Sequence, residues 1–99
     1  MPPFTASEIK KYLADTPTWS VTGDKKIHKE FKFKNFKQAL NFVNRVGSLA
    51  ESEGHHPDIN LHNWNRVTIT LSTHAINGLS ENDFIVAAKI DENEKKQQK

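Results

Sequence analysis

Four of the five histidines fall within the short stretch from His55 to His74. They are His55, His56, His62 and His74, and the adjacent pair is followed at once by Pro57. Imidazole is the side chain whose ordinary pKa lies closest to neutral pH, so it can give and take protons, and the neutral ring also binds metal ions. The cluster therefore predicts either acid–base catalysis or a metal site.

Two carboxylates could act with these histidines. Glu51 lies four residues before His55 on the last turn of a predicted helix, and Asp83 lies in the first turn of the final predicted helix. A carboxylate beside an imidazole orients the ring and stabilises its protonated form. His74 follows a predicted strand, so all these groups lie at the ends of elements and could converge on one pocket.

A zinc site is the competing hypothesis. Neutral imidazole is a zinc ligand, and His55, His56 and His74 could form a three-histidine site. Adjacent histidines on an extended chain point in different directions, however, and no two histidines are four residues apart as in a helical zinc site. The residues therefore favour proton transfer and leave metal binding open. His28 and His62 are explained as exposed residues on a strand and beside a turn.

Composition narrows the class of protein. The chain has 99 residues, enough for one domain over 1–99, with 35% hydrophobic and 26% charged residues. The absence of cysteine excludes disulfides, thiolate zinc sites and a cysteine nucleophile. A net charge of +2 is too small to indicate nucleic-acid binding. Because we find neither a signal-peptide pattern nor a membrane-spanning apolar run, we expect a cytoplasmic protein.

Helices and strands follow one another in the order α-β-β-α-β-β-α. The predicted elements are helix 6–14, strands 19–21 and 27–34, helix 36–53, strands 58–62 and 64–72, and a helix from about 80, followed by a fraying tail over 92–99. Capping patterns mark the helix starts, namely Thr5 with Glu8, Asn35 with Gln38, and Ser80 with Asp83. Hairpins, the first turning at Gly23-Asp24, imply antiparallel pairing. The order predicts a two-layer α+β sandwich with a four-stranded antiparallel sheet and three helices on one face.

The helix predicted over 36–53 carries an apolar stripe that we expect to face the core. The stripe comprises Phe36, Ala39, Leu40, Val43, Val46, Gly47 and Ala50, and Phe42 and Leu49 widen it. Gly54 follows as a residue type that ends helices, which places the two adjacent histidines just beyond the helix C-terminus.

The spacing of these residues resembles the signature of the pterin-4a-carbinolamine dehydratases. The matching residues are Glu51, His55-His56-Pro57, Trp64, His74 and Asp83. The stretch 67–74 followed by Gly78-Leu79-Ser80 is also similar to that family, as is Phe31-Lys32-Phe33 before the main helix. The likeness covers about residues 5–90, which is nearly the whole chain.

The resemblance implies a reaction and a set of partners. It implies loss of water from 4a-hydroxytetrahydropterin to give quinonoid dihydropterin, which recycles tetrahydrobiopterin without a metal or organic cofactor. It also implies a homodimer or homotetramer. Some members act in addition as dimerisation cofactors of a homeodomain transcription factor, a role that would add a protein partner and a nuclear location. Direct nucleic-acid binding and membrane attachment are not expected.

The resemblance also implies roles for individual residues. His56 and His74 would transfer protons on the two faces of the pterin, while His55 binds and orients it. Glu51 and Asp83 would hold and tune the imidazoles. The residues expected to contact the substrate are Trp19, Pro57, Ser72 and Thr73.

Overall fold

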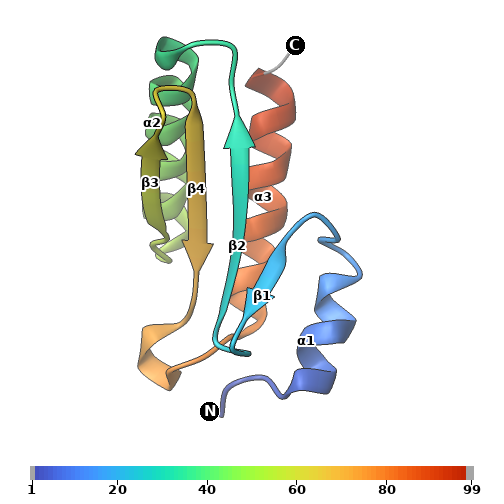
Figure 1. The fold of residues 1–99 in the computed structure, drawn as a ribbon. Coiled ribbons are helices and arrows are strands. Elements are labelled where there is room, and N and C mark those ends of the chain that lie inside the picture. The colour runs from blue at the N-terminus through green and yellow to red at the C-terminus, as the bar shows by residue number, and fades with distance from the viewer. Residues whose placement is uncertain (1, 98–99) are drawn as a thin grey trace.

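The computed structural model describes residues 2–97 and contains one four-stranded antiparallel sheet with three α-helices (Figure 1). The elements are α1 (Ala6–Leu13), β1 (Ser20–Thr22), β2 (Lys26–Lys32), α2 (Phe36–Glu53), β3 (Asp58–His62), β4 (Arg66–Leu71), the short 3₁₀ helix η1 (His74–Ile76) and α3 (Glu81–Gln97). The predicted fold class and element order are confirmed. No helix within residues 2–97 is long and apolar enough to cross a membrane.

The strands lie in the order β1-β2-β4-β3, so β2 and β4 form the centre of the sheet. Their register pairs Ile27 with Leu71 and Phe31 with Val67. Side chains alternate along β4 as the sequence predicted, with Val67, Ile69 and Leu71 buried against the helices. The opposite face carries polar side chains, and helices α2 and α3 leave it uncovered (Figure 1).

Local hydrogen bonds set the ends of the helices. Thr5 and Glu8 form the predicted capping box at the start of α1. The Asn35 side chain accepts from the Gln38 N–H at 2.8 Å, which starts α2. Gly54 ends α2 with φ of 64°, a left-handed conformation in which a residue without a side chain avoids a steric clash. The predicted limits of α2 are therefore confirmed.

The apolar stripe of α2 is only partly buried. Ala39, Phe42 and Val46 are inaccessible to solvent, and the Phe42 ring packs 4.8 Å from that of Phe31 between ring centroids. Phe36 and Leu40 are 48% and 42% exposed, so the prediction that they face the core was wrong. The reason is angular: successive residues turn by about 100°, so these two positions lie well to one side of Phe42.

Helix α3 extends further than the sequence suggested. We expected residues 92–99 to fray, but the helix continues through Gln97, and residues 98–99 lie outside the part that the structure describes. Asp91 accepts hydrogen bonds from Trp19 Nε1 at 3.1 Å and from Lys29 Nζ at 2.8 Å, which ties the second half of the helix to the sheet. Beyond it, Glu92 lies four residues before Lys96, a spacing that favours helix.

Replacing each of two α2 glycines with alanine should have opposite effects on stability. Gly54→Ala forces a side chain into the left-handed region and should lower the free energy of unfolding by about 1–2 kcal/mol. Gly47→Ala places its Cβ in open space within the helix and should raise that free energy by about 0.5–1 kcal/mol. Urea denaturation measures both. Changes of the same sign would contradict this account of the end of α2.

Candidate active site

The first feature of the site is a pair formed by His55 and Asp83. His55 Nε2 lies 2.5 Å from Asp83 Oδ1, and the two side chains are 14% and 0% exposed. Twenty-eight positions separate them in the sequence. They meet because α2 ends and α3 begins in the same part of the molecule, in the lower half of Figure 1. We call this the histidine end.

The second carboxylate oxygen of Asp83 also accepts hydrogen bonds. Oδ2 accepts from Thr73 Oγ1 at 2.7 Å and from the Ser80 N–H at 2.9 Å. Thr73 Oγ1 lies 2.8 Å from Ser80 Oγ, and because the one hydroxyl hydrogen of Thr73 goes to Asp83, Ser80 is the donor in that contact. A chain of hydrogen bonds thus runs from Ser80 through Thr73 and Asp83 to His55.

This network corrects one detail of the sequence interpretation. The Ser80–Asp83 capping box is half formed, because the Ser80 hydroxyl bonds Thr73 where a full box would have it bond the Asp83 N–H. The Thr73 hydroxyl donates to Asp83, and its expected contact with substrate stays a prediction. Ser80 was missed as a site residue because only the fold shows where its side chain points.

His56 has a different environment from its neighbour. Its Nε2 contacts Glu51 Oε2, and the two side chains are 64% and 77% exposed. The two adjacent imidazoles therefore meet different carboxylates, one buried and one open to solvent. Within residues 2–97, no group of three or more His, Cys, Asp or Glu side chains is arranged to hold a metal ion.

His74 lies beside the same network. It is exposed at the start of η1, and it directly follows Thr73, the residue that bonds Asp83. A cavity of about 220 Å³ adjoins it, lined by Lys25, Lys26, Ser72, Thr73, His74, Asn77 and Gly78. The cavity therefore contains two of the predicted substrate-contact residues and one predicted catalytic histidine.

The N-terminal segment packs against the loop that carries His74. The Phe4 N–H donates to the Leu79 carbonyl at 2.8 Å. A Cβ added to Gly78 would lie 2.5 Å from Cβ of Pro3, so this position leaves no room for a side chain. Glycine is required here by close approach of another segment.

Trp19 and His62 lie apart from this group. Trp19 is buried in the core with its ring edge against Phe31, and its indole N–H donates to Asp91. Asp91 lies eight residues along α3 from Asp83, about 12 Å at 1.5 Å per residue, and the expected contact of Trp19 with substrate stays a prediction. His62 Nε2 lies 3.0 Å from Thr68 Oγ1 on the open face of the sheet. Pro57, next to His56, is half-buried at the histidine end.

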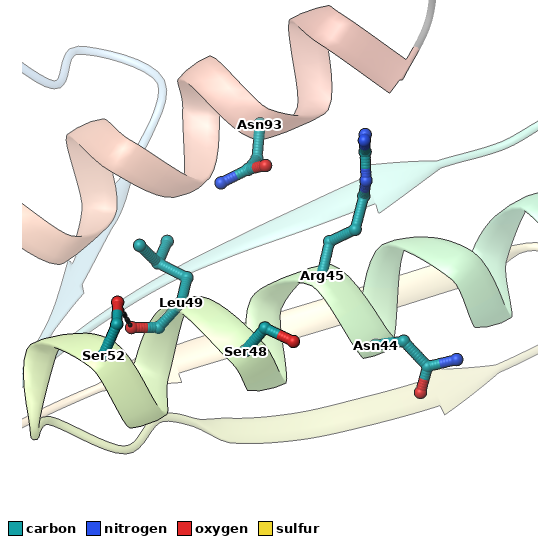
Figure 2. Close-up of a pocket in the computed structure, with 6 residues that line it drawn as sticks. All are labelled: Asn44, Arg45, Ser48, Leu49, Ser52 and Asn93. Carbon is teal, nitrogen blue, oxygen red and sulfur yellow. Dashed lines mark hydrogen bonds between the residues drawn. The ribbon is translucent and has the colours of Figure 1, made fainter.

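A second cavity, of about 430 Å³, lies between α2 and α3 (Figure 2). Its lining residues are Asn44, Arg45, Ser48, Leu49, Ser52 and Asn93. Figure 2 shows Ser52 turned back to the backbone of Leu49, whose carbonyl accepts its hydroxyl at 3.0 Å. Among residues 2–97, no histidine or carboxylate lines this cavity, so this part of the chain does not give it the acid–base groups of the histidine end.

The family model and the relatives that match this chain carry the same family name. The model of the family described as pterin 4 alpha carbinolamine dehydratase matches residues 2–93. A protein of Alkaliphilus metalliredigens named "Putative pterin-4-alpha-carbinolamine dehydratase" is 54% identical over 91 residues, covering 91% of this chain and 81% of the relative. An Arabidopsis thaliana protein named "Pterin-4-alpha-carbinolamine dehydratase 2, mitochondrial" is 46% identical over 91 residues, covering 89% of this chain and 49% of its own length.

A solved structure is similar over nearly the whole chain. The crystal structure of a transcriptional coactivator/pterin dehydratase from Brucella melitensis superposes with a TM-score of 0.83 at 36% sequence identity. The match covers 91% of this chain and 96% of that one.

The Asp83 network generates a stability prediction. Thr73→Val keeps the shape of the side chain but removes the donor to a buried carboxylate, so the free energy of unfolding should fall by about 1–3 kcal/mol. Thr70→Val is the matched control, since Thr70 lies on the open face of β4, and it should change stability little. Chemical denaturation of both variants provides the comparison, and equal effects would contradict the role given to Thr73.

Proposed function

Because this chain belongs to the pterin-4a-carbinolamine dehydratase family, we propose that it removes water from a 4a-hydroxytetrahydropterin to give the quinonoid dihydropterin. The arrangement of the three histidines gives this proposed function its main support. The histidine end combines an imidazole held by a buried carboxylate, His55 with Asp83, and two exposed imidazoles, His56 and His74. In a cell this reaction would return the pterin to the tetrahydrobiopterin cycle, and we place it in the cytoplasm.

The chemistry requires two proton transfers. The C4a–O bond breaks, and hydroxide is a poor leaving group unless an acid protonates it so that it departs as water. The proton on the neighbouring N5 is lost to a base as the C4a=N5 double bond forms. Positioned acids and bases typically contribute about 10²–10⁴-fold each to such steps. Imidazole can fill both roles near neutral pH.

The surroundings of the histidines support a division of roles. His55 is held by Asp83 and largely buried, which suits a group that binds and orients the substrate. His56 and His74 are open to solvent, which suits groups that exchange protons with a bound pterin. Glu51 contacts the His56 ring and would orient it.

Two neighbouring residues would help to shape the site. Pro57 restricts the backbone of the preceding residue, His56, to extended conformations, which limits the positions that its ring can take beside Glu51. Ser72 lines the cavity beside His74, where its hydroxyl could bond the polar edge of the pterin. No metal or organic cofactor is needed for these steps.

We further propose that the chain forms a homodimer or homotetramer. Phe36 and Leu40 expose an apolar strip on α2, and Val43 flanks it half-buried. Apolar surface of this kind commonly marks an interface. Among the described strands, β3 pairs on one side only, which leaves an edge open for continuation of the sheet. A protein partner on the same α2 strip, as in a transcriptional coactivator, is the alternative occupant.

Removing the exposed imidazoles should abolish most of the catalysis. His56→Ala and His74→Ala should each slow the dehydration by about 10²-fold or more, since each removes one proton-transfer group. His62→Ala is the control, because that ring contacts Thr68 and does not line the cavity beside His74. Stopped-flow measurement of carbinolamine dehydration, with circular dichroism to verify folding, gives the result. A folded His56→Ala variant with near-normal dehydration would overturn the assignment.

A charge introduced into the apolar strip of α2 should reduce the number of subunits in the oligomer. Leu40→Glu places a carboxylate in the proposed interface, so the mass measured by light scattering should fall toward that of a smaller assembly. Lys37→Glu, an exposed position on the same helix, should leave the mass unchanged. A wild-type monomer, or an unchanged mass for Leu40→Glu, would refute the proposed interface.

A further inference from the structure

A separate groove lies between α1 and α3, on the side of α3 that faces away from Asp83. It encloses about 340 Å³ and is lined by Tyr12, Asp15, Thr16, Glu81, Phe84, Ile85 and Ala88. The four α3 residues follow helical spacing and form one face, which lies on the opposite side of the helix from Asp83. The groove therefore shares no lining residue with the cavity beside His74.

The wall of the groove is aromatic and apolar. The rings of Phe4, Tyr12 and Phe84 form a cluster, with the Phe4 and Tyr12 centroids 4.8 Å apart and those of Tyr12 and Phe84 5.4 Å apart. Ile85 extends this surface and is itself exposed. A flat apolar group could pack against this wall and remove it from water.

The rim of the groove is acidic. The Tyr12 hydroxyl donates to Glu81 Oε2 at 3.2 Å, and Asp15 also lines the groove. Within residues 2–97, neither carboxylate forms an ion pair, and no basic side chain lines the groove. Burial, the hydrogen bond to Glu81 and the charges of Glu81, Glu8 and Asp15 together raise the pKa of the Tyr12 phenol above its usual value. The groove is thus locally negative in a chain whose net charge is +2.

The hydroxyl of Thr16 is a further polar group of the groove. Its side chain is 2% exposed and lines the groove, and its hydroxyl is buried without a hydrogen-bond partner among the described residues. Buried polar atoms nearly always have a partner, and exceptions often mark a position where a bound group supplies one. A ligand N–H reaching into the groove could donate to Thr16 Oγ1.

We propose that this groove binds a small aromatic amine in its protonated form. The aromatic body would lie on Phe84 and Ile85, and the ammonium group would bond Glu81, Asp15 and Thr16. A cavity of this size falls within the range of small-molecule sites. Its seven lining residues are far fewer than the 20–30 per side of a typical protein interface, which argues for a small ligand.

Titration with phenethylamine tests the proposal. Amide shifts in ¹⁵N NMR spectra should move over residues 12–16 and 81–88 and follow one saturable curve. 3-Phenylpropionate, which has a similar body and the opposite charge, should leave these signals in place. The His56→Ala variant should bind phenethylamine like the wild type, so binding is tested independently of dehydration. Shifts confined to the histidine end, or equal binding of both compounds, would overturn the proposal.

Substitutions in the groove test which of its residues contact phenethylamine. Glu81→Gln should weaken phenethylamine binding about tenfold or more, because it removes a charge-assisted hydrogen bond. Glu92→Gln makes the same charge change on an exposed part of α3 and should leave the affinity unchanged. Thr16→Val should weaken binding severalfold while the protein stays folded by circular dichroism. Wild-type affinity in both Glu81→Gln and Thr16→Val would show that the groove is not the site.

Discussion

The buried carboxylate of Asp83 is the constraint on which the candidate site depends. A charge removed from water is tolerated only where donors surround it, and Asp83 is completely buried. Its donors are His55 after α2, Thr73 after β4 and Ser80 before α3. Each hydrogen bond therefore fixes one element relative to the others. The histidine end is held together by this shared acceptor, and the positions of the catalytic candidates follow from it.

The two adjacent histidines show how a helix end can separate two environments. Gly54 turns the chain sharply through its left-handed conformation, and the next two side chains then point to different carboxylates. His55 is anchored in the protein, and His56 stays in contact with solvent. An acid–base site requires both a fixed geometry and an accessible proton carrier, and one dipeptide provides a residue of each kind.

Helix α3 serves several surfaces at once. One side presents Asp83, Ala87 and Ile90 to the interior, and the other presents Phe84 and Ile85 toward α1. The period of 3.6 residues allows this separation within a few turns. Helix α2 is similar, since its core contacts through Phe42 leave Phe36 and Leu40 exposed. Apolar surface thus remains on both helices after the core is complete.

The sequence by itself determined the features that depend on neighbours in the chain. The ends of α2 followed from Asn35 and Gly54, and the capping box at Thr5 was read correctly, because the hydrogen bonds involved span only three or four residues. Alternation along β4 was likewise local, and with the hairpins it was sufficient to predict the antiparallel sheet. The family resemblance identified the three histidines and two carboxylates as one set of site residues.

Only the tertiary structure decided which side chains meet. The Trp19 indole donates to Asp91, and the Thr73 hydroxyl donates to Asp83. The buried side of α2 was set by where the sheet touches it, and the attachment of α3 to the sheet by contacts from residues more than 60 positions away. These outcomes depend on partners that become neighbours only on folding, and no local pattern records them.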